Sequence, residues 1–153
     1  MGTDVLAGRY ELQRLIGRGG NGEVWQALDR SLGRDVAVKV VDASDGDAPA
    51  TRRFQQEARA AASLNHPHVV AVYDAGTDGQ RAYLVMELLP GPPLSELVRR
   101  EGPLSPERAE DLTAQAAAGL EAVHGVGVVH RDVKPGNLVL DRHGRVKVVD
   151  FGI

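Results

Sequence analysis

The residues best suited to chemistry lie in two short stretches near the end of the chain. Residues 130–137 read HRDVKPGN, and residues 150–152 read DFG. The first stretch carries a carboxylate (Asp132), an ammonium group (Lys134) and an amide (Asn137), and the second begins with another carboxylate. Phosphoryl transfer needs such a set, because one acid must orient a hydroxyl, a cation must balance the moving phosphoryl group, and two oxygen ligands must hold magnesium.

Each of these groups has a predicted role in such a reaction. Asp132 is expected to receive the proton of the substrate hydroxyl, a contribution typically worth about 10²–10⁴-fold in rate. Lys134 would balance charge on the transferred phosphoryl group. Asn137 and Asp150 supply hard oxygen ligands, which suit Mg²⁺, with Mn²⁺ as an alternative.

The alternative is that these are ordinary solvated side chains on a loop. Apolar runs at 128–129 and 138–140 flank the loop and predict buried strands that would hold it in place. Residues 141–144 read DRHG, which is typical of a hairpin turn leading into the strand before DFG. His130 and Phe151 are expected to be packing residues. The agreement of residue types and spacing favours the catalytic interpretation.

A glycine-rich stretch lies near the start of the chain. Residues 17–24 read GRGGNGEV, and glycines let a backbone approach phosphates closely and direct its amides at them. This pattern alone also fits an ordinary glycine turn. A dinucleotide-binding motif requires a helix directly after the glycines, but the residues after Gly22 predict a strand, so Asp42 is not expected to bind a ribose. The arrangement strand–glycine loop–strand predicts a loop that covers phosphates.

A lysine follows this loop on the next predicted strand. Alternation along the strand places Ala37 and Lys39 on one face, where the ammonium group can neutralise nucleotide phosphates. Glu57 is the predicted acid partner, because its helical neighbours Phe54 and Ala58 are apolar and a carboxylate near a buried face is costly unless it is paired. The alternatives are a surface lysine at a strand end and a solvated acid on a helix.

The elements that position these residues are predicted from the hydrophobic pattern. Strands are predicted over residues 10–16, 23–28, 36–41, 69–73 and 81–86, with a turn at 76–79 between the last two. A polar loop at 42–50 precedes a helix in which Phe54, Ala58 and Ala61 recur at helical spacing.

A proline-rich linker at 89–93 separates this strand-rich part from a helical part. Ser95 is predicted to cap a short helix that runs through Arg100. Ser105 is a predicted N-cap, with proline at the first helical position and an acid in the first turn. The apolar face of that helix is expected to comprise Leu112, Ala116, Leu120 and Val123.

Composition argues against several other classes of protein. The 153 residues are 42% hydrophobic and 25% charged, an ordinary balance for a folded domain. A net charge of −3 argues against a nucleic-acid-binding protein whose affinity rests on a basic face. The sequence has no run of about 18 apolar residues, so no membrane contact is expected within these residues. It also has no signal-peptide pattern and no cysteine. His66 and His68 have no further ligand cluster, so a metal site there is not expected.

Taken together, these motifs resemble those of the eukaryotic-like (Hanks-type) serine/threonine protein kinases of bacteria, from about Tyr10 to Ile153. The resemblance implies an α+β, protein-kinase-like bilobal fold, with an antiparallel-sheet N-lobe containing one main helix and the beginning of a mainly helical C-lobe. The implied boundaries are about 8–88 for the N-lobe, 89–93 for the hinge and 94–153 for the start of the C-lobe.

The resemblance also implies a set of ATP-binding residues. Met86 corresponds to the gatekeeper, and the backbones of Glu87 and Leu89 correspond to the hinge that reaches adenine. The apolar walls around the base would be Ile16, Val24, Ala37 and Val139. The phosphate-binding set would be Gly17, Arg18, Gly19, Gly20, Asn21, Gly22, Lys39 and Glu57.

The implied activity is ATP-dependent phosphorylation of serine and threonine on proteins, as in a non-specific serine/threonine protein kinase of the cytoplasm. Lys134, two residues after Asp132, favours the serine/threonine class over tyrosine kinases. One alternative is a small-molecule kinase of the aminoglycoside type, against which Arg131 and Lys134 argue together. Another is a non-catalytic module that binds nucleotide. Self-association, the physiological substrate and any membrane anchor beyond residue 153 are left open.

Two features depart from the family pattern. Asn21 occupies the tip of the glycine loop, where a larger apolar or aromatic residue is common. The chain also ends at Ile153, before the activation segment and later helices of the family. We therefore expect these residues alone to be inactive, and Leu112 and Leu120 to lack the helices that would cover them.

Overall fold

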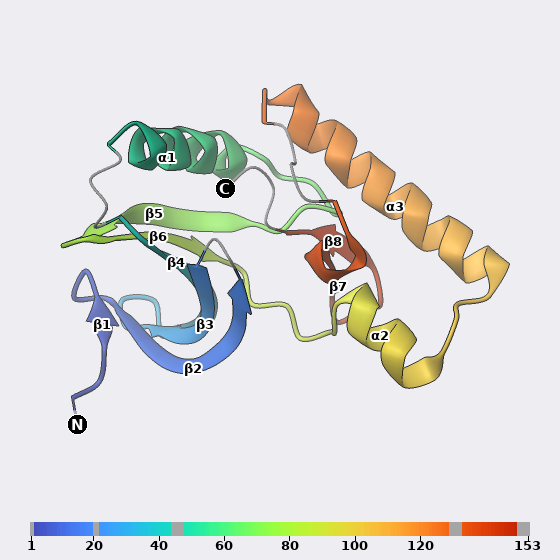
Figure 1. Ribbon diagram of the computed structural model, residues 1–153, viewed down its shortest axis with the longest axis horizontal. Helices are drawn as coiled ribbons and strands as arrows, with labels where there is room; N and C mark the ends of the chain where they lie inside the picture. The colour runs from blue at the N-terminus through green and yellow to red at the C-terminus, as the bar shows by residue number, and fades with distance from the viewer. Residues whose placement is uncertain (1, 20–21, 44–47, 129–132, 150–153) are drawn as a thin grey trace. The chain divides into compact units, whose positions relative to one another are not determined.

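The computed structural model describes residues 2–19, 22–43, 48–128 and 133–149, which belong to two units (Figure 1). Unit 1 comprises Met1–Arg59 and Val72–Leu88, and unit 2 comprises Ala60–Ala71 and Leu89–Ile153. The segment 60–71 thus belongs to unit 2, although in sequence it lies between the two parts of unit 1.

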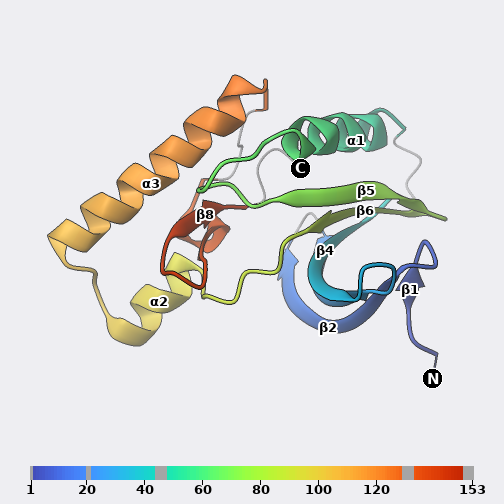
Figure 2. The same ribbon diagram turned by 180° about the vertical axis from the view of Figure 1, so that it is seen from behind.

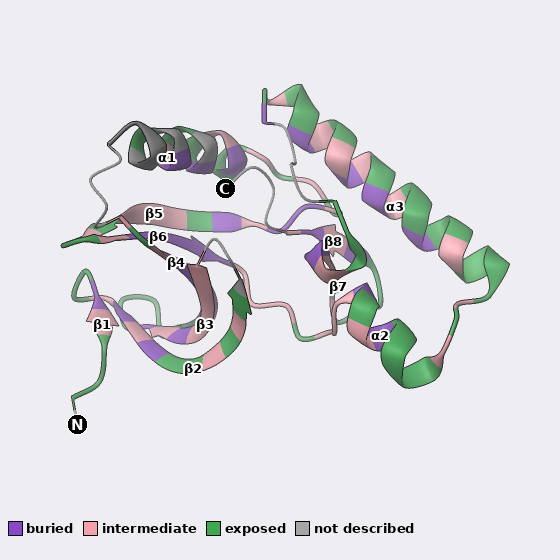
Figure 3. Cartoon of the chain, in the orientation of Figure 1, coloured by how far each residue is buried: buried purple, intermediate pink, exposed green. Residues whose placement is uncertain are grey.

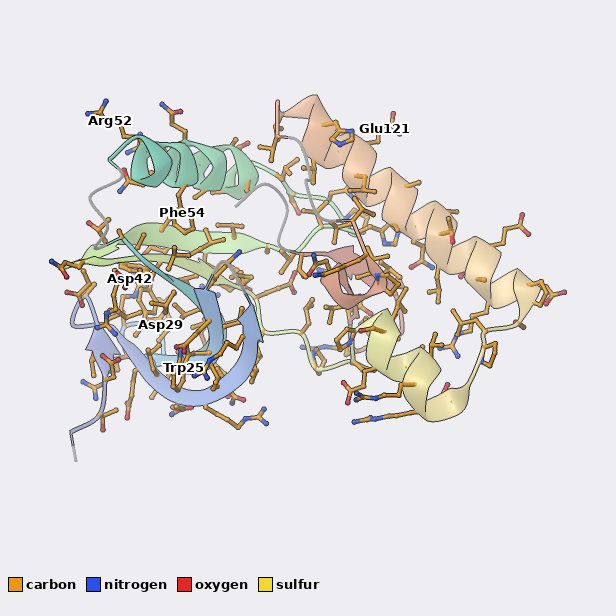
Figure 4. The ribbon with its side chains drawn as sticks, in the orientation of Figure 1. Trp25, Asp29, Asp42, Arg52, Phe54 and Glu121 are labelled. Carbon is orange, nitrogen blue, oxygen red and sulfur yellow. The ribbon has the colours of Figure 1, made fainter. Side chains whose placement is uncertain are left out.

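Unit 1 is built around a six-stranded antiparallel sheet. Its strands are β1 (Val5–Leu6), β2 (Tyr10–Gly19), β3 (Gly22–Asp29), β4 (Arg34–Asp42), β5 (Val72–Asp78) and β6 (Arg81–Met86), in the order β1-β2-β3-β4-β6-β5. Figures 1 and 2 both show helix α1 (Ala48–Ala62) lying over β5 and β6. Its buried Phe54 points toward the sheet (Figure 4). The antiparallel sheet with one main helix, predicted for this part of the chain, is confirmed.

The main hydrophobic core of unit 1 lies on one face of the sheet. Side chains alternate between faces along a strand, so Val36, Val38 and Val40 of β4 point to the same side. They are buried (Figure 3) in a cluster with Leu6, Tyr10, Leu12, Ala27, Tyr83 and Val85. The opposite face of β4 carries Ala37 and Lys39, which do not belong to this cluster.

A buried carboxylate holds the strands of unit 1 together at one end (Figure 4). Asp29, the last residue of β3, is only 1% exposed. It accepts hydrogen bonds from Arg9 Nε (2.8 Å) and Arg9 Nη2 (2.9 Å), and from the backbone N–H groups of Ser31 and Leu32. The hydrogen bonds from Arg9 lower the pKa of Asp29 to about 2, against the opposing effect of burial. The ionised carboxylate therefore connects the turn after β3 to the residue that precedes β2.

Unit 2 contains two helices and a short hairpin. Its elements are α2 (Leu94–Glu101), α3 (Pro106–Gly125), the 3-10 turn η1 (Pro135–Asn137), β7 (Leu138–Leu140) and β8 (Val146–Val148). Their buried apolar residues form one cluster of Leu94, Leu97, Leu112, Ala116, Leu140 and Val146. Leu112 is only 3% exposed, so the expectation that it lacks cover is wrong, because residues of α2 and of the hairpin pack around it. Leu120 is half-buried.

The turn predicted at residues 76–79 is shorter and later than expected. Strand β5 continues through Asp78, and Gly76 lies within it, opposite Tyr83 of β6. The Tyr83 ring occupies the space that a side chain at residue 76 would need. This glycine therefore makes room for the ring within a strand and does not form a turn. Val69, predicted to lie in the same strand, is outside β5 and pairs instead with Val148 of β8.

The predicted helix starts were only partly correct. Ser105 is the N-cap of α3, and its hydroxyl accepts a hydrogen bond of 3.2 Å from a backbone N–H of the first turn, as predicted. Ser95 is not a cap, because Pro93 holds the N-cap position of α2 with its carbonyl accepting bonds from the first turn. Helix α1 begins at Ala48, inside the loop predicted at 42–50.

Close packing explains the glycine in the middle of α3. Gly119 lies on the buried face of the helix. A Cβ at this residue would overlap the carbonyl oxygen of His68 and would lie 3.0 Å from Val148 Cγ2. Helix α3 can therefore approach the segment around His68 only with glycine at this position.

Gly119→Ala should destabilise the protein, although alanine is the better helix former. Within a helix, alanine normally gains about 0.5–1 kcal/mol over glycine, whereas overpacking against His68 costs about 1–3 kcal/mol. Gly125, the last residue of α3, has open space where its Cβ would lie, so Gly125→Ala is the matched control and should be neutral or stabilising. Urea unfolding measures both changes in free energy, and a Gly119→Ala variant as stable as the control would contradict this packing.

Acid should remove the contribution of Asp29 to stability. Its pKa falls from 3.8 to about 2 in the folded protein, so the folded state keeps the carboxylate ionised where the unfolded chain binds a proton. The stabilisation is complete above about pH 5 and is lost as the pH falls from about 4 toward 2. In the Asp29→Asn variant this part of the pH dependence should be absent. Melting temperatures across this pH range test the prediction, and parallel profiles for the two proteins would refute it.

Candidate active site

The face of the sheet opposite the main core of unit 1 brings several predicted site residues together. Residues directly opposite each other on neighbouring strands share a face. Lys39 of β4 lies opposite Val24 of β3 and Leu84 of β6, and Ala37 lies opposite Met86. Because Ala37 and Lys39 are two residues apart on β4, all five side chains share this face. The strand register therefore places one ammonium group among apolar neighbours.

Burial of Lys39 is the most unusual property of this face. Its side chain is only 5% exposed, and a buried ammonium group is costly unless anionic or hydrogen-bonding groups meet it. Such a position suits a lysine that meets phosphate oxygens. Glu57, the predicted acid partner, lies in α1, but its side chain is outside the described part of the structure.

The glycine-rich stretch forms the hairpin between β2 and β3. Gly19 pairs with Gly22 at its tip, and Gly17 pairs with Val24 further down. Gly22 has φ +133°, and a Cβ there would overlap the carbonyl oxygen of Val40 on β4, so this position requires glycine.

Ile16, a predicted apolar wall of a nucleotide site, precedes Gly17 in the same hairpin. It lies at a register shift between Leu15 and Gly17 and is 43% exposed. The hairpin therefore presents an apolar side chain that the sheet itself does not bury.

Polar contacts along the hairpin involve two residues that the sequence motifs did not single out. Glu23 Oε1 accepts a hydrogen bond of 2.8 Å from Arg18 Nη2, and Glu23 Oε2 accepts one of 3.1 Å from Trp25 Nε1. Arg18 was predicted to belong to the phosphate-binding set, and it contacts this carboxylate across the hairpin. The contact between Arg18 and Glu23 depends on the register of the two strands, whereas Trp25 meets Glu23 from the same face of β3.

The predicted hinge residues lie on both sides of the boundary between the units. Met86, the predicted gatekeeper, is the last residue of β6 and is 6% exposed, while Glu87 and Leu89 are half-buried. In unit 2, the following linker pairs with β7, because Gly91 N–H donates to Leu140 O (3.1 Å) and Leu140 N–H donates to Pro92 O (3.1 Å).

This pairing of the linker positions β7, which carries Val139. Val139 is half-buried and forms a bridge with Pro93 of the linker. A Cβ at Gly91 would overlap the carbonyl oxygen of Leu140, so the close approach of linker and strand depends on this glycine.

In unit 2, one hydrogen bond joins Asn137, a predicted metal ligand, to the last described residue before Asp150. Asn137 ends the turn η1 and is 6% exposed, and its carbonyl oxygen accepts a hydrogen bond of 3.0 Å from Val149 N–H. Val149 is the residue before Asp150 in the chain. Lys134, which is exposed, precedes the turn and accepts a hydrogen bond of 2.9 Å from Asn137 N–H at its own carbonyl.

Four predicted site residues lie outside the described part of the chain. They are Gly20, Asn21, Asp132 and Asp150. Among the described residues, no group of three or more His, Asp or Glu side chains is arranged to hold a metal ion. The predicted metal site is not such a group, because it combines the amide of Asn137 with a single carboxylate, that of Asp150.

The chain was compared with known proteins. The family profile described as protein kinase domain matches residues 10–153. The serine/threonine-protein kinase PknA of Mycobacterium tuberculosis is 49% identical over 155 residues, which cover 97% of this chain and 36% of that protein. A probable serine/threonine-protein kinase of Streptomyces coelicolor is 49% identical over 153 residues (97% of this chain, 23% of that protein). PknB of Mycolicibacterium smegmatis is 46% identical over 153 residues (97% and 24%).

The chain spans about a third of the length of PknA and about a quarter of the length of the other two. Within the ranges that the structure describes, no helix is long and apolar enough to span a membrane. Proteins of the matched family use ATP together with a divalent metal ion. Since the profile covers nearly all of the sequence, with the antiparallel sheet and helices expected for it, the chain belongs to the protein kinase domain family.

Proposed function

We propose that this chain forms the nucleotide-binding and catalytic-loop parts of a protein kinase that transfers the γ-phosphoryl group of ATP to serine and threonine hydroxyls. The observation that carries the proposal is the hydrogen bond from Val149 N–H to Asn137 O, because it joins the catalytic loop to the residue before Asp150. The names of the relatives support the serine/threonine class. The proposed boundaries are about 8–88 for the N-lobe, 89–93 for the hinge and 94–153 for the start of the C-lobe.

In unit 1, the proposed nucleotide-binding face is the one that carries Lys39. Its ammonium group would meet phosphate oxygens, with Glu57 as the acid that holds it. The apolar side chains of Val24 and Ala37 beside it suit the flat apolar surface of a base. The remaining proposed contacts of unit 1 are Ile16, Gly17, Arg18, Gly19, Gly20, Asn21, Gly22, Met86 and Glu87.

In unit 2, Leu89 and Val139 would add an apolar surface for the base, with the backbone of Leu89 as the hinge contact. The pairing of the linker with β7 supports this assignment, because it holds the two residues in neighbouring segments.

Asn137 and Asp150 would hold a divalent ion, Mg²⁺ or Mn²⁺. The donor set fits, because an amide oxygen and a carboxylate are the hard ligands that these ions take. When bound, the ion neutralises charge on the phosphate oxygens. The burial of Asn137 and its position in η1 restrict its side chain to few orientations.

Asp132 and Lys134 would act on the transferred group. Asp132 would accept the proton of the substrate hydroxyl, and Lys134, whose side chain is exposed, would balance the charge of the phosphoryl group as it moves. Neither role requires the side chain to be buried before the substrate binds.

Asp132→Asn in the full-length gene product should abolish phosphoryl transfer while leaving ATP binding intact. The amide cannot accept the hydroxyl proton, so the rate should fall by at least about 10²-fold. Transfer of labelled phosphate from ATP to a protein substrate measures the rate, and calorimetric titration with ATP measures the affinity. Glu121→Gln, which neutralises an exposed carboxylate on α3, is the control and should retain full activity.

Two outcomes would contradict the proposal. Activity retained by the Asp132→Asn variant would remove Asp132 from the proposed role. Transfer by the wild type to aminoglycosides or other small amines and alcohols, with none to proteins, would instead indicate a small-molecule kinase.

A further inference from the structure

The outer edge of strand β8 is paired with groups from two distant parts of unit 2. Val146 N–H donates a hydrogen bond of 2.8 Å to Gln115 Oε1 of α3, and Val146 O lies 2.9 Å from His68 Nδ1. Further along the strand, Val148 N–H donates to His68 O (2.9 Å), and Val70 N–H donates to Val148 O (3.1 Å). Two side chains and one backbone segment thus pair with this edge of the strand.

The orientation of the Gln115 amide is determined by its second contact. Gln115 Nε2 donates a hydrogen bond of 3.0 Å to Asp111 Oδ2, one helical turn earlier in α3. An ionised carboxylate only accepts hydrogen bonds, so the NH₂ group must face Asp111 and the oxygen must face Val146. The contacts with Asp111 and Val146 require the same orientation of the amide, which keeps Gln115 Oε1 directed at β8.

The His68 side chain has one consistent tautomer for the same reason. The carbonyl oxygen of Val146 only accepts, so His68 Nδ1 must carry the proton. The backbone N–H of His68 donates a hydrogen bond of 3.0 Å to His66 Nδ1, which orients the segment. The absence of a side chain at Gly119 lets α3 approach the carbonyl oxygen of His68.

These contacts matter because β8 leads directly to a proposed metal ligand. Val146 and Val148 are fully buried, so their backbone groups have no water to replace a lost partner. On its other edge β8 pairs with β7, and Val149 N–H donates to Asn137 O. The position of β8 along its neighbours therefore determines where Val149 lies, and Asp150 is the next residue in the chain.

We propose that Gln115 and His68 are positioning residues for the metal-binding segment. By pairing with both backbone groups of Val146 on the outer edge of β8, they keep the strand in register and so direct Asp150 toward the ion that it shares with Asn137. Neither residue has a role in the chemistry proposed above, and neither needs to touch ATP or substrate. The inference rests on the proposed function, because it assigns these residues to the metal site of that reaction.

The first test replaces Gln115 in the full-length gene product. Gln115→Met keeps the length of the side chain but removes the acceptor, and should raise the Mg²⁺ concentration for half-maximal rate by about 10-fold or more. The KM for ATP at saturating Mg²⁺ should stay near the wild-type value. Glu121→Met, an apolar change at an exposed position of the same helix, is the control and should change neither quantity.

A rescue variant separates positioning from a general loss of packing. In the double variant Gln115→Glu with Asp111→Asn, the new carboxylate accepts from Val146 N–H and from the new amide, so every hydrogen bond and the net charge are kept. In this variant, the Mg²⁺ concentration for half-maximal rate should return to the wild-type value. In the same way, His68→Asn can keep a donor near Val146 O and should resemble the wild type, whereas His68→Leu should resemble Gln115→Met.

A readout without catalysis distinguishes failure of this inference from failure of the proposed function. Amide hydrogen exchange in metal-free protein should be faster at Val146 and Val149 in Gln115→Met and normal in the rescue variant. Binding of Mn²⁺ in the presence of ATP should weaken about 10-fold in Gln115→Met, whether or not a protein substrate is phosphorylated. An unchanged metal requirement together with unchanged Mn²⁺ binding would overturn the inference, even if the variant were less stable.

Discussion

The site in unit 2 depends on the pairing of a hairpin that is too short to be stable alone. Strands β7 and β8 have three residues each, and an isolated two-stranded hairpin is at best marginally stable in water. The linker pairs with β7, and the segment around His68 pairs with β8, so backbone groups at both outer edges find partners. This pairing fixes Val139, Asn137 and Val149 relative to one another. The position of Asn137, and of the residue before the proposed ligand Asp150, therefore depends on the hydrogen bonds at both edges of this small sheet.

In unit 1, the two faces of one sheet differ in character. One face packs a large apolar cluster, which includes Val38 of β4, and this cluster stabilises the sheet. The other face carries Lys39, whose burial would be costly without groups that meet its charge. Alternate positions of β4 therefore carry the apolar core and the buried lysine that is proposed to meet the nucleotide.

Local patterns predicted much of the fold and failed where a distant contact decided the outcome. The strands that carry the glycine loop and Lys39, and the N-cap at Ser105, were predicted correctly because alternation and capping act within a few residues. Gly76 was assigned to a turn, but the ring of Tyr83 gives it another reason to be glycine. Leu112 was expected to lack cover, but α2 and the hairpin pack around it within the same 153 residues.

The sequence by itself determined which residues could carry the chemistry, and membership of the protein kinase domain family, because both depend on residue type and spacing. It also determined the strand alternation that places Ala37 and Lys39 on one face. Only the tertiary structure decided that Gln115 and His68 meet at Val146, 31 and 78 residues away in sequence. No local period encodes such partners, because they depend on how α3, the segment around His68 and β8 pack together. The same packing explains why Gly119 has no side chain.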